Sequence, residues 1–72
     1  MIMKTEEEIK AIALGDARRI YRDLSVYNIE LKKKGSMWEV MFTFKDVEMD
    51  GGGPFYEIDA ETGAILRKVY YQ

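Results

Sequence analysis

The sequence predicts an α+β fold in which one N-terminal helix packs on a curved four-stranded antiparallel meander sheet. In the first third of the chain, apolar residues recur at three- and four-residue spacing, which is typical of an amphipathic helix. In the rest of the chain, apolar and polar residues alternate, which is typical of strands with one buried face. Because the helix stripe and the apolar strand face must both be buried, we expect the sheet to curl across the helix.

The helix is expected to begin after Thr5, where Thr5 and Glu8 have the spacing of a capping box. Its apolar stripe comprises Ile9, Ile12, Ala13, Ala17, Ile20 and Leu24. The basic residues Arg18, Arg19 and Arg22 suit the negative end of the helix dipole. Gly15 costs about 1 kcal/mol relative to alanine inside a helix, so we expect it to permit a close approach to the sheet or a kink.

Four alternating segments follow, at residues 26–31, 37–45, 55–60 and 64–71. Residues 32–36, Lys-Lys-Lys-Gly-Ser, are expected to form a basic turn, and residues 61–63 a tight one. The register of the last segment stays open. Ile65 and Leu66 are adjacent and must face opposite sides of the sheet unless a bulge intervenes.

The composition bounds the class of protein. With 72 residues, the chain is expected to form one domain over residues 1–72. Hydrophobic residues make up 47% and charged residues 33%, which is typical of a globular protein. The absence of cysteine excludes disulfides and fits a reducing compartment. The absence of histidine removes the commonest general base and the commonest metal ligand.

Charge and hydropathy indicate which partners to expect. Eleven basic and 13 acidic residues give a net charge of −2, which does not supply the basic surface that nucleic acids require. No segment reaches transmembrane length, and the N-terminus lacks the apolar region of a signal peptide. We therefore expect neither a nucleic-acid nor a membrane partner. The expected location is cytoplasmic if the chain is complete, and outside the cell if it was cut from a longer precursor.

The segment 46–57, DVEMDGGGPFYE, resembles a calcium-binding loop in its spacing of oxygen ligands. The ligand set would be Asp46, Glu48, Asp50 and Glu57, with Gly51 at the glycine position. Against a metal site, both flanks are expected to be strands rather than helices, and residues 52–54, Gly-Gly-Pro, replace the ordered middle of such a loop. A solvated hairpin loop is the favoured interpretation, and calcium binding remains the alternative.

No residue pattern predicts catalysis or a bound cofactor. Ser25 and Ser36 have no recognisable base, and the triple glycine of residues 51–53 lacks the lysine and helix of a phosphate-binding loop. Asp59 and Glu61 have the chemistry of a hydrolase pair, but Asp59 is better placed to accept amide hydrogens from the following turn. We therefore expect a protein that is not an enzyme.

A sheet with a single helix leaves one face uncovered, and that face is the candidate binding surface. The residues predicted to contact a protein partner are Asp46, Glu48, Asp50, Gly51, Gly52 and Gly53 in the loop and Met37, Met41 and Phe55 on the sheet. Scattered surface hydrophobes or a dimer contact are the alternative explanation. Monomer and homodimer both remain open, because an edge strand can pair with a copy of itself and residues 51–53 can act as a hinge.

Three segments resemble PepSY domains: FYEIDAETGAIL near the C-terminus, EEIKAIALGDA in the helix and WEVMFTF in the middle of the sheet. The chain is also similar to small bacterial immunity proteins, which carry a glycine pair before a strand and turn of this kind. Both resemblances imply a cystatin-like fold, with binding or inhibition rather than catalysis. They imply no cofactor.

The resemblances also imply the kind of partner. PepSY domains occur in protease propeptides, which suggests a protease. The immunity-protein resemblance suggests a basic toxin, for which an acidic loop is complementary. Cystatin inhibitors of cysteine proteases carry a Gln-Val-Val-Ala-Gly type of hairpin, and residues 32–36 do not match it. The predicted function is a small non-catalytic protein-binding domain, inhibitory or regulatory. The alternatives are calcium binding, a small-molecule site between helix and sheet, and an engineered scaffold.

Overall fold

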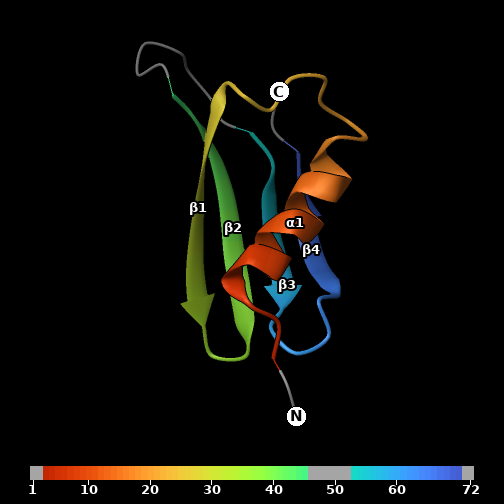
Figure 1. Cartoon of the computed structure of the whole chain (residues 1–72), viewed down its shortest axis with the longest axis vertical. Coiled ribbons are helices and arrows are strands. Elements are labelled where there is room, and N and C mark those ends of the chain that lie inside the picture. Colours follow the sequence, from red (N-terminus) through yellow and green to blue (C-terminus); the bar gives the residue numbers. More distant parts are fainter. Residues whose placement is uncertain (1–2, 46–52, 71–72) are drawn as a thin grey trace.

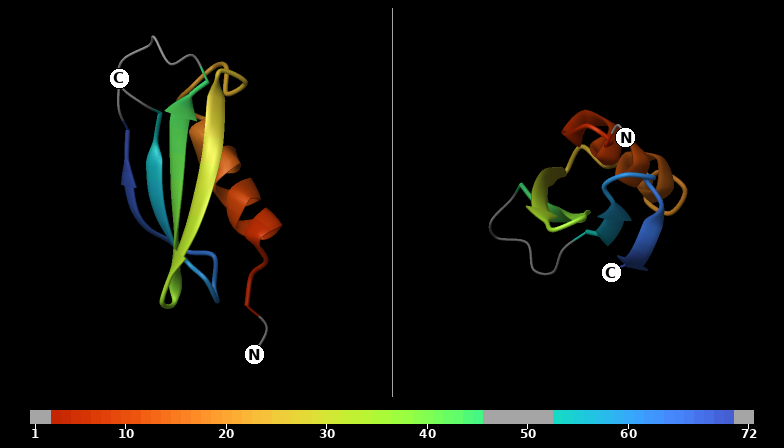
Figure 2. Two further views of the ribbon diagram at one scale, coloured as in Figure 1. Left: turned by 90° about the vertical axis from the view of Figure 1, so that its left-hand side faces the viewer. Right: turned by 90° about the horizontal axis from the view of Figure 1, so that it is seen from below.

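The computed structural model describes residues 3–45 and 53–70 and confirms the predicted fold class. Its elements are α1 (Glu6–Ala17), β1 (Tyr27–Lys34), β2 (Met37–Phe44), β3 (Phe55–Asp59) and β4 (Ile65–Val69). The strands form one open sheet in the order β1-β2-β3-β4, with every neighbouring pair antiparallel. Helix α1 crosses one face of this sheet (Figure 1). No described helix or strand covers the other face, which we call the outer face (Figure 2).

The predicted capping box begins α1. The Glu8 backbone N–H donates to the Thr5 hydroxyl over 3.2 Å, and the Thr5 N–H donates to the Glu8 carboxylate over 2.9 Å. These reciprocal bonds satisfy two amides that the first turn would otherwise leave without partners. The bond from the Thr5 backbone lowers the pKa of Glu8, because it stabilises the ionised carboxylate.

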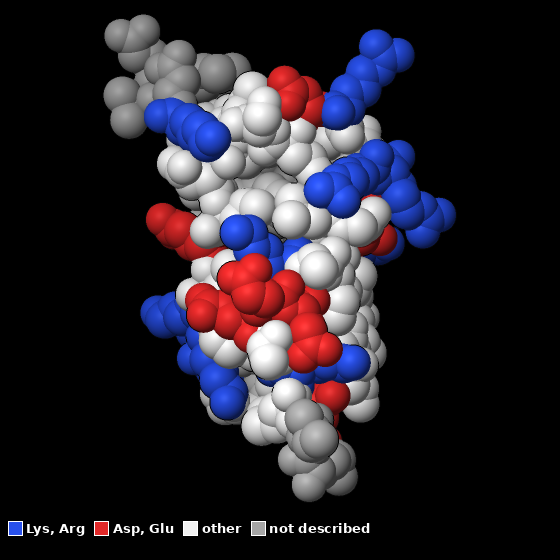
Figure 3. All heavy atoms as spheres, in the orientation of Figure 1, with Lys and Arg blue, Asp and Glu red and all other residues white. Residues whose placement is uncertain are grey.

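The predicted end of the helix is wrong, because α1 ends at Ala17 and does not continue to Leu24. The Arg19 and Ile20 amides bond to carbonyls three residues back, which tightens the chain into a turn. Ile20 consequently leaves the apolar stripe and is 56% exposed. The predicted basic last turn also fails. The basic side chains lie beyond the end of α1, while acidic side chains gather over its start (Figure 3).

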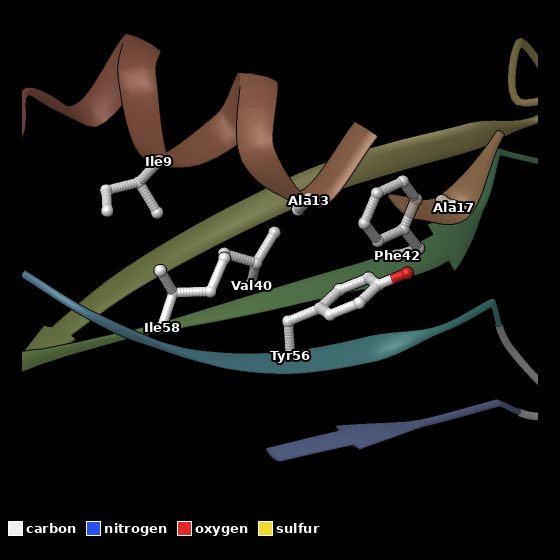
Figure 4. Close-up of a cluster of buried hydrophobic side chains, with 7 residues drawn as sticks. All are labelled: Ile9, Ala13, Ala17, Val40, Phe42, Tyr56 and Ile58. Carbon is white, nitrogen blue, oxygen red and sulfur yellow. The ribbon is translucent and has the colours of Figure 1, made fainter. Parts of the chain in front are cut away.

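The core lies between α1 and the sheet. Its fully or almost fully buried members are Ile9, Ala13, Ala17, Val40, Phe42, Tyr56 and Ile58 (Figure 4). The alternation of β2 and β3 places their core residues on the same side, since Val40 lies opposite Tyr56. Small alanines on α1 let the helix lie close to the large strand side chains. The small-molecule alternative would need a cavity between α1 and these side chains, and it stays a prediction.

The predicted basic turn of residues 32–36 is shorter than expected. Strand β1 continues through Lys34, and only Gly35 and Ser36 connect it to β2. Gly35 has a φ of 60°, the left-handed conformation that two-residue hairpin turns require. The three lysines therefore belong to an edge strand, with Lys34 paired to Glu39 over 3.4 Å.

A bulge settles the register of the last strand. The pairing of β3 with β4 shifts between Glu57 and Ile58, so that Ile58 lies opposite Ile65 while Glu57 lies opposite Arg67. Leu66 is the extra residue and is 56% exposed. Ile65 therefore packs against the core. Of the two alternatives that the sequence left open, the one with a bulge is the one observed.

A largely buried carboxylate ties the end of α1 to the sheet. Asp16 accepts hydrogen bonds from the hydroxyls of Tyr56 over 2.8 Å and Tyr70 over 2.6 Å, and Lys68 lies 3.4 Å away. The Asp16 side chain is only 11% exposed. The Tyr70 hydrogen bond is the main cause that lowers the pKa of Asp16. Burial, followed by the contact with Asp16, raises the pKa of Tyr56. The network thus satisfies the one polar atom that Tyr56 carries into the core.

Gly15 does not have the predicted role of permitting a close approach to the sheet. It is exposed on α1, and a Cβ built there meets nothing within 4 Å. We expect Gly15→Ala to raise the free energy of unfolding by about 0.5–1 kcal/mol, because alanine restricts the unfolded chain and favours the helix. Urea unfolding followed by circular dichroism measures this change. A destabilised variant would show that Gly15 is needed for a conformation that alanine cannot adopt.

The Asp16 network should make stability depend on pH. The pKa of Asp16 is lower in the folded chain than its ordinary value of 3.8, so the ionised carboxylate stabilises the fold at pH values above 3.8. This stabilisation is lost as the pH falls through the pKa of the folded state. Asp16→Asn should cost about 1–2 kcal/mol at neutral pH, because both hydroxyls lose a charged acceptor. Below pH 3.8 its difference from the wild type should shrink.

The measurement is urea unfolding of both proteins at neutral and acid pH. Lys68→Gln serves as the control, because its side chain is 47% exposed and a solvent-screened ion pair should contribute little to stability. An Asp16→Asn deficit that is equal at both pH values would contradict the electrostatic role.

Candidate binding surface

The turn that follows β3 accounts for the most distinctive motif of the sequence, residues 58–63. The Asp59 carboxylate accepts the backbone N–H of Glu61 over 2.8 Å and of Thr62 over 3.0 Å. The Thr62 hydroxyl in turn accepts the Ala64 N–H over 3.1 Å. The backbone hydrogen bond from Thr62, followed by the one from Glu61, lowers the pKa of Asp59, because both bonds stabilise the ionised carboxylate. The proposed pairing of Asp59 with Glu61 is thus a turn contact, and Asp59 is poorly suited to donate a proton.

The same motif joins three separate parts of the chain. Ala60 is fully buried, its N–H bonds to the Ser36 carbonyl, and its carbonyl accepts the Lys4 N–H over 2.7 Å. Gly63 follows with a φ of 77°, and a Cβ there would lie 2.7 Å from the Ile12 side chain. Asp59, Ala60, Thr62 and Gly63 thus each have a structural role, and the candidate binding surface considered next lies elsewhere on the sheet.

The outer face presents the side chains that alternate with the core. Met37 and Met41 on β2 and Phe55 on β3 lie there, as the sequence predicted. Met41 is 43% exposed, and Phe55 and Met37 are half-buried. Their neighbour Val69 on β4 lies opposite Phe55, which itself lies opposite Met41. Met41, Phe55 and Val69 therefore form an apolar row across three strands.

A charged row runs beside the apolar row. It comprises Lys32, Glu39, Glu57 and Arg67, one from each strand in sheet order. Glu39 lies directly opposite Glu57, an arrangement of like charges that is unfavourable unless cations are near. Lys34 supplies one at 3.4 Å from Glu39. The sequence did not reveal this row, because it depends on the strand register and on the bulge in β4.

The other predicted contact residues fall into two groups. Gly53 is buried, and its backbone N–H bonds to the Phe42 carbonyl over 2.9 Å. A Cβ on Gly53 would come within 2.8 Å of the Tyr27 ring, so this glycine permits a close backbone approach rather than presenting a surface. The predicted contact residues Asp46, Glu48, Asp50, Gly51 and Gly52 lie outside the described residues.

The calcium alternative stays a prediction for the same reason. Of its four ligands, only Glu57 lies in the described part of the chain, where it occupies the middle of β3. Within residues 3–45 and 53–70, no three acidic side chains are close enough together to hold a metal ion. The site thus depends on Asp46, Glu48 and Asp50.

The contacts of Ser25 form a local turn rather than a catalytic arrangement. The Ser25 hydroxyl donates to Asp23 over 2.6 Å, and Asp23 also accepts the Ser25 backbone N–H. These bonds lower the pKa of Asp23, so it is a weak base toward the serine. Sequence reasoning found no base for Ser25, and the structure gives it one whose geometry is that of a local turn.

Residues 4–69 match the family described as PepSY, peptidase propeptide and YPEB domain. The chain therefore belongs to the PepSY family, as its motifs indicated. Neither a curated protein nor a solved structure matched the chain with significance. The description names a propeptide, which is a regulatory segment of a peptidase rather than its catalytic part.

The family bears on the predicted location. Within the described residues, no helix has the length and apolarity to cross a membrane. PepSY domains are often parts of exported proteins, so membership does not support the predicted cytoplasmic location.

We expect the turn motif to be sensitive to substitution at Gly63. Gly63→Ala should destabilise the fold by about 1–2 kcal/mol for the left-handed backbone and by about 1–3 kcal/mol more for the clash with Ile12. Gly35→Ala is the matched control, because its φ is also positive but a Cβ there meets nothing within 4 Å. Urea unfolding of both variants isolates the packing contribution. Equal losses would show that the contact between the turn and α1 is not tight.

Proposed function

We propose that the chain is a non-catalytic protein-binding domain that inhibits or regulates a peptidase. Its family supports this role, because the description places such domains in peptidase propeptides. The proposed contact surface is the outer face. The observation that carries this assignment is the apolar row of Met41, Phe55 and Val69, whose most accessible member, Met41, is 43% exposed.

The outer face has the physical properties of a protein contact. Apolar side chains at its middle can be desolvated by a partner, and methionine adapts its shape to different surfaces. The charged row beside it supplies both signs of charge, which would orient a partner rather than attract it from a distance. Because the side chains project from a hydrogen-bonded sheet, little order would be lost on binding.

The test is inhibition of purified peptidases of the serine, cysteine, aspartic and metal-dependent classes. The chain should slow at least one of them, and Met41→Glu should weaken that inhibition by about tenfold or more, because it buries a charge at the contact. Ile20→Glu is the matched control, since Ile20 is 56% exposed and lies beyond α1, off the outer face.

Two results would contradict the proposal in different ways. Inhibition that Met41→Glu leaves unchanged would move the contact away from the outer face. A chain that neither slows nor binds any class of peptidase would remove the inhibitory function. Thermal unfolding of both variants should match the wild type, which separates lost contacts from lost folding.

A further inference from the structure

Strand β1 offers a regular, uncovered edge to a partner strand. It has eight residues and pairs with β2 through all eight without a bulge. No described helix or strand covers its outer side (Figure 2, left). The opposite edge, β4, has five residues and a bulge, which are features that discourage pairing. Edge pairing is therefore expected at β1.

The outward backbone groups of β1 can be identified from one hydrogen bond. Lys45 N–H donates to the Val26 carbonyl over 2.9 Å, so the backbone groups of Val26 point toward β2. In an antiparallel ladder these directions alternate, and every second residue turns its N–H and C=O outward. The outward residues within β1 are Tyr27, Ile29, Leu31 and Lys33, and the Tyr27 N–H already donates to the Leu24 carbonyl over 3.2 Å. Within residues 3–45 and 53–70, no backbone group bonds to Ile29, Leu31 or Lys33 on that side.

Symmetry limits how two copies of β1 can pair. A twofold axis normal to the sheet keeps both outer faces on the same side of the joined sheet. Residues opposite each other in a ladder also point to the same side. Two copies of one strand satisfy both conditions only when the two sequence numbers in each pair of opposed residues add up to an even number. One residue then lies on the axis, opposite its own copy.

Charge selects one of these registers. With Leu31 on the axis, Glu30 lies opposite Lys32 of the second copy, and the symmetry repeats this pair. With Glu30 on the axis, glutamate faces glutamate, and with Lys32 on the axis, lysine faces lysine. Opposite charges across a ladder stabilise it and like charges destabilise it, so the register with Leu31 on the axis is favoured.

The two charged residues are free to make these contacts. Glu30 and Lys32 are both exposed, and they point to the outer face between Asn28 and Lys34. Neither forms an ion pair within the described residues. Glu39 lies across from Lys32 but pairs with Lys34 instead. The charges that the second copy needs are therefore present on the first and not already used.

We propose that two copies of this chain pair antiparallel through β1, with Leu31 on the twofold axis, to form a continuous eight-stranded sheet. The outward groups of Ile29, Leu31 and Lys33 complete the ladder. Ile29 then lies opposite Lys33, and two Leu31 side chains meet on the side that carries α1. The lysines of β1 oppose Asn28, Ile29 and Glu30 of the second copy and never each other. This pairing does not depend on the proposed peptidase contact.

A charge exchange tests both the pairing and its register. Glu30→Lys and Lys32→Glu should each lower self-association, because each places like charges opposite one another twice. An equal mixture of the two variants should form a heterodimer, because both opposed pairs then carry opposite charges. The double variant Glu30→Lys with Lys32→Glu should associate like the wild type. Sedimentation equilibrium over a series of concentrations measures each state.

Glu61→Lys is the control, because it makes the same charge change at an exposed turn outside β1. It should leave self-association unchanged. A wild-type chain that stays monomeric at all concentrations would overturn the proposal. A wild-type dimer whose two single variants fail to form a heterodimer would overturn the register. Circular dichroism of each variant shows whether the fold is retained.

A cysteine cross-link gives an independent test, since the chain has no cysteine of its own. In a hydrogen-bonded antiparallel pair the two Cα atoms lie about 5.5 Å apart, within the range that a disulfide spans. Leu31→Cys should therefore form a covalent dimer in a glutathione redox buffer. Lys34→Cys should not, because the two copies of residue 34 would lie about 20 Å apart. Cross-linking of Lys34→Cys in preference to Leu31→Cys would refute the register.

Discussion

The packing of one helix against one face of the sheet is the constraint on which the rest of the structure depends. Side chains alternate along a strand, so every residue that packs on α1 sends its neighbour to the opposite side. Val40 and Tyr56 are fully buried for this reason, and Met41 and Phe55 are placed on the outer face. A chain of this length buries only about 60% of its unfolded surface. The apolar row is thus a consequence of the fold as well as a candidate contact.

The Asp16 network shows why the end of α1 could not be predicted from spacing. The apolar periodicity continues through Ile20 and Leu24, and nothing local marks Ala17 as the last helical residue. The helix ends where Asp16 meets the hydroxyls of Tyr56 and Tyr70, which lie 40 and 54 residues away in sequence. The start, by contrast, was predicted correctly because the capping box is entirely local.

The binding surface was predictable only in part, for a related reason. Alternation alone placed Met37, Met41 and Phe55 on the uncovered face. The neighbours of these residues required the register, which for Val69 depends on a bulge that the sequence left as an alternative. The full length of edge strand β1 was not predicted, because the lysines before Gly35 were assigned to a turn and the predicted strand ended at Leu31. The hairpin needs only two residues, so those lysines extend the strand.

The motif that most resembles the family and the surfaces proposed to bind are different parts of the molecule. The turn after β3 holds the ends of the sheet and the start of α1 together, and the outer face and the outward backbone groups of β1 take no part in its hydrogen bonds. The two proposed contacts are compatible. A twofold axis normal to the sheet keeps both outer faces on one side, so pairing through β1 would place both apolar rows on the same side of the joined sheet, with the two β1 strands between them. A partner with two matching sites would then bind more tightly than one copy allows.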